Sequence, residues 1–296
     1  MKGINFLESV LILGGRLMDK RFLTPEEVAN ATINASIKKA SLDTTSCIWL
    51  GILAGIFIGL GGAGNILASQ TLSNIDAGLA RLVGATVFPV GLMLVVICGA
   101  ELFTGNNLMT LAVMNKKITL RELFRNWSLV YIANFIGSTL LAVAIFYAGT
   151  FNGDASNKVI SIAQSKSTLT ILEALIRGIL CNMIVVLAVW MATAAQDIIS
   201  KIFACWFPIM LFVLCGFEHS VANMFFIPMG MLLGANVTIG QLITNLIVVT
   251  IGNMIGGAIL IPYMYNKIFI RNQSSEKAAH NKSVSYTHLR AHETRS

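Results

Sequence analysis

Two apolar stretches, residues 79–114 and 198–236, are much longer than one membrane crossing requires. A spanning α-helix needs about 20 predominantly apolar residues. Each stretch also has glycine, polar residues and proline part-way along: Pro89 in the first, Pro208 and Pro228 in the second. We therefore predict that both helices break inside the membrane. Broken backbone is tolerated at that depth only where it is packed in protein or lines a cavity.

Four shorter apolar stretches complete the predicted membrane body, at residues 47–68, 126–149, 171–195 and 241–268. Only 12% of the chain is charged and 55% is apolar, whereas soluble proteins carry about 25% charged residues. Lipid must therefore cover most of the surface, and we predict an all-α integral membrane protein of six transmembrane helices. The net charge of +7 does not indicate nucleic acid, because the basic residues are spread over short loops.

The distribution of lysine and arginine predicts the orientation. Basic residues occur before the first span, after the second, and after the fourth and sixth, and such loops stay on the cytoplasmic side. We expect a multi-pass membrane protein with both termini cytoplasmic.

The two ends of the chain differ from this body. Residues 1–45 are expected to be an N-terminal extension followed by a surface amphipathic helix, which Thr24, Pro25 and Glu27 would cap. Met18 is a more ordinary start than Met1. Residues 272–296 are polar and patternless, which predicts a disordered or non-native tail. The channel domain would then span residues 46–271.

The two long stretches contain related sequences. "CGAELFTGN" (98–106) and "CGFEHSVAN" (215–223) share C-G-x-E-x-x-x-x-N, and "NFIG" from Asn134 matches "NMIG" from Asn253. The two motifs come in the same order in both halves of the chain, which indicates a duplication of three spans, about 46–150 and 170–271. An odd number of spans requires the second copy to be inverted. In inverted repeats with broken helices, the binding site lies at the repeat interface.

Three ionisable residues lie at the predicted breaks. Glu101 and Glu218 are equivalent in the two repeats, and their symmetry favours carboxylates that accept hydrogen bonds from backbone N–H groups freed by each break, rather than proton or substrate sites. His219 has no counterpart. An ionisable residue inside a membrane is a functional hypothesis by default, and imidazole can donate to an anion or take up a proton near neutral pH.

Two further residues are candidates near His219. The hydroxyl of Thr104 is expected to face His219 across the breaks, and Lys166, in a loop before the fourth span, is expected to attract anions. For Lys166 an ordinary solvated charge is the commoner interpretation. All five cysteines lie in apolar segments without a CxxC pair, so we interpret them as small buried apolar side chains rather than a metal or disulfide site. We expect no metal, no cofactor and no enzyme activity.

These motifs resemble the formate/nitrite transporter family over about residues 22–270. The resemblance rests on "GAELFTGN", "RGILCNMIVVLAVWMA", "GFEHSVANMFFIPMG" and "TIGNMIGG". It implies an aquaporin-like fold, a homopentamer in the lipid bilayer with one pore per protomer, and passage of small monovalent anions such as formate, nitrite or hydrosulfide. Proton coupling is implied for some members. The sequence does not choose among these anions, and nothing in it selects the hydrosulfide branch.

The resemblance also implies roles for individual residues. His219 would be the central histidine with Thr104 opposite, and Lys166 would lie near the outer mouth. The remaining pore positions are an inner apolar constriction at Leu102, an outer one at Leu92 and Phe212 with Phe88 nearby, and polar lining residues Asn182 and Asn253.

Other classes of protein fit less well. A neutral-solute channel of the aquaporin type would carry Asn-Pro-Ala at both breaks, and no proline follows an asparagine here. An ammonium channel would pair two pore histidines, and the membrane body has only His219. A membrane metalloenzyme would cluster His, Cys or carboxylate ligands. The neutral-solute channel remains the alternative to an anion channel.

Overall fold

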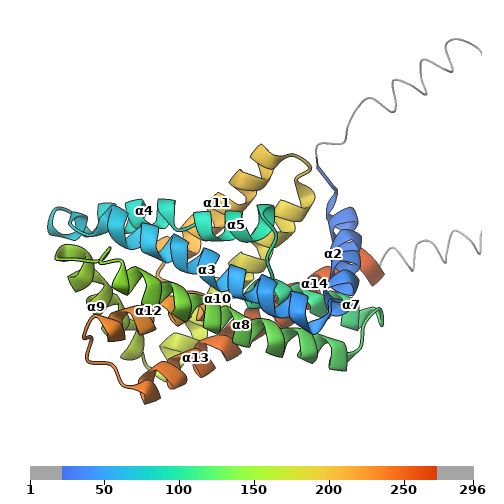
Figure 1. The fold of residues 1–296 in the computed structure, drawn as a ribbon. Coiled ribbons are helices and arrows are strands. Elements are labelled where there is room, and N and C mark those ends of the chain that lie inside the picture. Colours follow the sequence, from blue (N-terminus) through green and yellow to red (C-terminus); the bar gives the residue numbers. More distant parts are fainter. Residues whose placement is uncertain (1–21, 272–296) are drawn as a thin grey trace, which may run out of the picture.

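The computed structural model describes residues 22–271, so the predictions for residues 1–17 and 272–296 lie outside the described part of the chain. Residues 22–271 form an elongated helical bundle (Figure 1). In chain order the helices are α2 Pro25–Ala40, α3 Thr44–Ser69, η1 Leu72–Asn74, α4 Ala77–Val87, α5 Val90–Ile97, α6 Phe103–Asn106, η2 Asn107–Met109, α7 Thr110–Met114, α8 Leu120–Tyr147, α9 Asp154–Ser167, α10 Ile171–Ala194, α11 Ile198–Leu214, α12 Ser220–Leu232, α13 Ile239–Met254, η3 Ile255–Leu260, α14 Ile261–Tyr265 and η4 Asn266–Arg271.

Within the described residues, five helices are long and apolar enough to cross a membrane. They are Thr44–Ser69, Ala77–Ile97, Leu120–Tyr147, Ile171–Ala194 and Ile239–Arg271. The predicted fifth span instead consists of two shorter apolar helices, α11 and α12. The third span begins at Leu120 rather than at residue 126, because Thr119 and Glu122 form a reciprocal capping box that starts the helix earlier.

Both long stretches leave the helical conformation where the repeated motif lies. The chain is non-helical between Ile97 and Phe103 and again between Leu214 and Ser220. Each break contains a glycine with positive φ, Gly99 at 84° and Gly216 at 71°, a conformation that glycine adopts without steric cost. The prolines are not at the breaks, since Pro208 and Pro228 lie inside α11 and α12.

Two short helices lie at opposite ends of the bundle. Figure 1 shows α2 across one end and α9 at the other. Both ends of the described chain lie at the α2 end, where η4 contacts α2. The expectation that Lys166 occupies a loop is wrong, because residues 154–167 form α9 and place Lys166 in its last turn.

Close packing of α3 against α8 forms the largest helix contact of the bundle. It depends on glycines: a Cβ on Gly55 would overlap the carbonyl oxygen of Asn134, and one on Gly137 would overlap the carbonyl oxygen of Ile52. Small residues of this kind let helix backbones approach closely in lipid. The contact holds α8 at the distance at which its side chains reach the first break.

We predict that Gly137→Ala lowers the stability of the folded protein by about 1–3 kcal/mol, the usual cost of overpacking. The apparent melting temperature in detergent measures the effect. Gly240→Ala is the matched control, because its Cβ would meet nothing closer than the Thr238 Oγ1 at 3.8 Å. Equal melting temperatures for the two variants would contradict the packing argument.

Candidate functional site

Asn134 of α8 replaces the backbone hydrogen bonds that the first break loses. Its Nδ2 donates to the carbonyl oxygens of Gly51 and Glu101, at 2.8 and 2.9 Å. Its Oδ1 accepts from the backbone N–H of Phe103, the first residue of α6, at 3.0 Å. One fully buried amide therefore satisfies three backbone groups, which would otherwise be costly to bury.

Asn253 of α13 does the same at the second break. Its Nδ2 donates to the carbonyl oxygens of Gly178 and Glu218, at 2.8 and 2.9 Å. Its Oδ1 accepts from the N–H of Ser220, the first residue of α12, at 2.9 Å. The expectation that the two glutamates accept these backbone N–H groups is therefore wrong. An amide both donates and accepts, as a broken helix end requires, whereas an ionised carboxylate only accepts.

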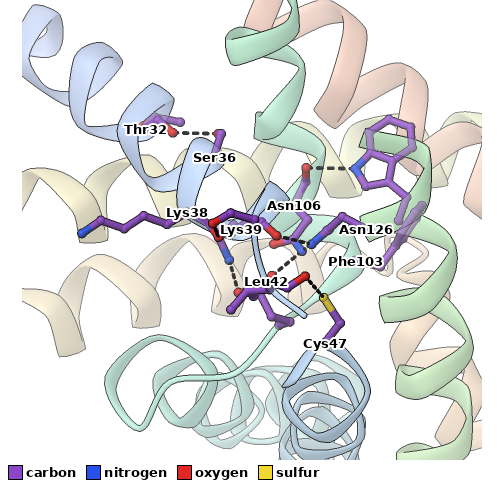
Figure 2. Close-up of polar contacts among 12 residues, drawn as sticks. Thr32, Ser36, Lys38, Lys39, Leu42, Cys47, Phe103, Asn106 and Asn126 are labelled. Carbon is purple, nitrogen blue, oxygen red and sulfur yellow. Dashed lines mark hydrogen bonds and ion pairs between the residues drawn. The ribbon is translucent and has the colours of Figure 1, made fainter. Parts of the chain in front are cut away.

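The carboxylate of Glu101 is bound by side chains instead. It accepts from the Nζ of Lys39 at 2.6 Å and from the Nδ2 of Asn106 at 2.6 Å. Asn106 also donates to Asn126 at 2.9 Å, and Asn126 donates to the backbone carbonyl of Lys39 at 3.2 Å. Figure 2 shows Lys39, Asn106 and Asn126 converging at the α2 end of the bundle.

Glu218 is held by a matching set. It accepts from the Nζ of Lys166 at 2.9 Å and from the Nδ2 of Asn223 at 2.7 Å. Asn223 donates to Asn245 at 2.8 Å, and Asn245 donates to the carbonyl of Lys166 at 2.8 Å. Lys166 is thus an ion-pair partner whose side chain is 17% exposed, not a free solvated charge.

Two cavities approach the breaks from opposite ends. The Lys166 vestibule, of about 400 Å³, is walled by α3, α4, α9, α11 and α12, and its lining includes Lys166, Phe88, Phe212, His219 and Phe226. The Lys39 vestibule, of about 530 Å³, includes Lys39, Glu101, Leu92 and Leu102.

A narrow apolar zone separates the vestibules. It contains a void of only about 10 Å³, lined by Ile58, Phe88, Leu92, Leu102, Val185, Ile209, Phe212 and His219. A void of this size holds about one water molecule. Leu92 and Phe212 both line this void. Leu92 also lines the Lys39 vestibule with Leu102, and the aromatic pair Phe88 and Phe212 lines the Lys166 vestibule with ring centroids 5.8 Å apart.

His219 lines this zone, and its ring contacts Thr104, as the sequence predicted, although Thr104 itself lines none of the three cavities. The Thr104 Oγ1 lies 2.8 Å from the His219 Nε2, and both residues are buried, at 0% and 3% exposure. The ring of Phe212 stacks on the imidazole with centroids 5.8 Å apart and planes 23° apart. The two helix breaks therefore bring together residues 115 positions apart in the chain.

The backbone determines the tautomer of His219. As N-cap of α12, the imidazole accepts a hydrogen bond at Nδ1 from the backbone N–H of Ala222, at 3.1 Å. A backbone N–H only donates, so Nδ1 is unprotonated and the neutral ring carries its hydrogen on Nε2. The Nε2–H then donates to Thr104, whose own hydroxyl hydrogen has no acceptor among residues 22–271. The Thr104 O–H is consequently the free donor of the pair.

Asn182 and Asn253 do not line any of the cavities described above. The Nδ2 of Asn182 donates to the carbonyl oxygens of Thr104 and Asn253, at 3.3 and 2.8 Å, and to the Oδ1 of Asn107 at 3.1 Å. Both amides thus connect the two breaks to their neighbouring helices, which corrects the expectation of lining positions.

Sequence reasoning missed Lys39 and the four asparagines of the carboxylate networks. A signal for Lys39 was present: Lys39 and Lys166 are separated by 127 residues, the same separation as Gly51 and Gly178. Asn126 and Asn245 likewise share the separation of 119 residues found between Asn134 and Asn253. No cluster of three metal-ligating side chains occurs in residues 22–271.

We predict that Lys166→Met destabilises the folded protein by about 3 kcal/mol, because it leaves the buried Glu218 carboxylate without its cation. The double variant with Glu218→Gln should recover at least half of the loss. The matched pair is Lys39→Met with and without Glu101→Gln, for which we expect a smaller loss, since Lys39 is 30% exposed and Lys166 17%. Chemical denaturation in detergent gives all four values.

The double variant decides the outcome. If Lys166→Met and the double variant are equally unstable, the ion pair is not what holds Glu218, and the network described here is wrong.

Comparison with known proteins gives a family model and relatives that indicate the same family. The family model "Formate/nitrite transporter" matches residues 26–266. An uncharacterized transporter, YrhG of Bacillus subtilis, is 43% identical over 86% of this chain and 97% of the relative, and the formate channel FocA of Escherichia coli K12 is 36% identical over 84% and 95%.

Solved structures agree with these relatives. An FNT family ion channel superposes with a TM-score of 0.74 at 29% identity, covering 81% of this chain and 97% of that one. A pentameric formate channel with formate bound gives a TM-score of 0.69 at 32% identity, covering 77% and 98%. This chain therefore belongs to the formate/nitrite transporter family.

Proposed function

We propose that the protein is a channel for small monovalent anions, with formate the first candidate, and that each protomer contains its own pore. The observation that carries the proposal is the Thr104–His219 pair, because His219 lines an apolar zone between two lysine-containing vestibules and Thr104 is hydrogen-bonded to it. Formate is favoured because the curated relatives include formate channels and a similar solved structure contains formate.

The proposed path runs from one vestibule to the other. An anion in the Lys166 vestibule loses water as it passes the rings of Phe88 and Phe212, and this desolvation excludes hydrated cations and larger solutes. The Thr104 hydroxyl then donates to it, oriented by the His219 Nε2–H. Leu92 and Leu102 form the second apolar passage before the Lys39 vestibule.

Proton coupling depends on how His219 is held. A second proton on the ring has to go to Nδ1, which accepts from Ala222 in this structure. Protonation of His219 would therefore break the N-cap of α12. We propose that the resting imidazole is a neutral donor, and that any proton crossing with the anion travels as part of the weak acid itself.

We further propose that the fold consists of two inverted repeats in an aquaporin-like arrangement. The support is that each break has the same hydrogen-bonded set: an asparagine that caps it, and a Lys–Glu–Asn–Asn network beside it. The position of α2 and α9 at opposite ends of the bundle agrees with inversion (Figure 1). The repeats would then be about 25–147 and 154–271, slightly longer than the sequence suggested.

The assembly and orientation are also proposals. A homopentamer in the lipid bilayer is supported by the pentameric formate channel among the similar solved structures, and native mass spectrometry would count the protomers. We propose that both termini are cytoplasmic, and the support is that the ends of the described chain share one end of the bundle and the neighbouring loops are basic. The membrane would then be a bacterial inner membrane.

We predict that proteoliposomes containing the protein take up formate and that Thr104→Val lowers the uptake rate about tenfold, the effect of one lost hydrogen bond of about 1.4 kcal/mol. Valine has nearly the shape of threonine but lacks the hydroxyl. Thr104→Ser keeps a donor and should retain at least half of the rate. A panel of formate, nitrite and hydrosulfide identifies the preferred anion.

Two results would contradict the proposal. If liposomes with the wild-type protein take up none of the three anions faster than empty liposomes, the channel function is wrong. If Thr104→Val conducts as well as wild type, the hydroxyl is not the donor.

A further inference from the structure

The two vestibules are alike close to the breaks but differ at their mouths. Near the break each contains one lysine paired with one glutamate, Lys166 with Glu218 and Lys39 with Glu101. The Lys39 vestibule is otherwise lined mainly by apolar residues, including Val95, Val96 and Val189. The Lys166 vestibule adds two further cations and a polar rim.

Those cations are Arg81 of α4 and Lys158 of α9, and the rim is completed by Asn65, Ser69, Ser73 and Ser161. Lys166 and Glu218 offset one another because they form an ion pair. Among the described residues no other carboxylate lines this cavity. Arg81 and Lys158 are therefore two positive charges without a carboxylate inside the vestibule, whereas the charged residues lining the Lys39 vestibule, Lys39 and Glu101, cancel.

The geometry of α9 places two of the cations, Lys158 and Lys166, one after the other along a path toward the break. Lys158, Ile162 and Lys166 are four residues apart on α9 and all three line the cavity, as expected for one helix face. The rise of about 1.5 Å per residue puts Lys158 roughly 12 Å from Lys166 along the helix axis. An anion at Lys158 would thus be two helical turns from the lysine nearest the break.

Lys158 is not fully solvated. Its Nζ donates to the carbonyl oxygen of Ser69, at the end of α3, at 2.6 Å. Burial lowers the pKa of the Lys158 ammonium, because the charged form has lost part of its hydration. A bound anion would replace that hydration. Arg81, which is exposed, presents a planar set of N–H donors suited to a carboxylate.

We propose that Arg81 and Lys158 form an anion-binding site at the mouth of the Lys166 vestibule, which takes a small carboxylate before it reaches Lys166 and His219. The inference rests on the proposed function and extends it. It implies that the two sides of the channel are unequal, with half-saturation reached at a lower anion concentration from the Lys166 side.

The test measures initial formate uptake into proteoliposomes over a range of formate concentrations for wild type and the double variant Arg81→Gln, Lys158→Gln. Each protein is measured at ionic strengths of about 0.01 M and about 1 M, where the Debye lengths are roughly 30 and 3 Å. The matched control is Lys117→Gln, Arg121→Gln, which removes the same charge from exposed positions that line none of the cavities described here.

We expect the Arg81/Lys158 double variant to raise the half-saturation concentration about three- to tenfold at low ionic strength, with maximal uptake within about twofold of wild type, because local anion concentration depends on the charge of the vestibule. The difference should shrink to less than about twofold at high ionic strength. The Lys117/Arg121 control should match wild type at both.

Three results would overturn the proposal: a half-saturation concentration that does not change, a change of the same size in the control, or a loss confined to the maximal rate. If the double variant does not fold, Arg81→Gln alone is measured instead, because it leaves the Lys158–Ser69 contact in place. The same three results would then overturn the proposal. Lys158→Arg keeps the positive charge, so its half-saturation concentration should stay below that of the Arg81/Lys158 double variant. If wild-type liposomes take up no anion, the proposed function fails instead.

Discussion

The structure depends on how backbone groups are hydrogen-bonded where two helices break inside a membrane. An unpaired N–H or C=O costs several kcal/mol in lipid, so each break needs its own donors and acceptors. Asn134 and Asn253 provide them, each through three hydrogen bonds to backbone groups. Because these amides complete the backbone, Glu101 and Glu218 are available to pair with lysines at the floors of the two vestibules.

The need to hydrogen-bond the backbone at a helix break also determines which ring nitrogen of His219 carries the hydrogen. Where α12 begins, the imidazole caps the helix by accepting from Ala222. At the corresponding position before α6 stands Leu102, which has no capping side chain. A single residue therefore both ends a helix break and lines the narrow apolar zone between the vestibules, and its helix-capping bond is what leaves an Nε2–H for Thr104.

Sequence patterns predicted the features that depend on spacing: the helix breaks, the Thr104–His219 contact and the family. They were wrong about which groups the two carboxylates and the two asparagines contact in three dimensions. The Lys39–Glu101 pair joins residues 62 positions apart. The repeat spacing relates Lys39 to Lys166, but it does not show that either lysine binds a carboxylate unless α2 and α9 are placed at the two ends of the bundle. Asn182 and Asn253 resembled pore positions but bond to backbone.

The most direct test of this account is the protonation state of the two ring nitrogens of His219, measured by ¹⁵N solid-state NMR of histidine-labelled protein in lipid bilayers, with His219→Gln to assign the signals. We predict an unprotonated Nδ1 that accepts from an amide N–H and a protonated Nε2 at neutral pH. A protonated Nδ1 would contradict the account, because the backbone of α12 would then lack its cap and Thr104 would not be the free donor.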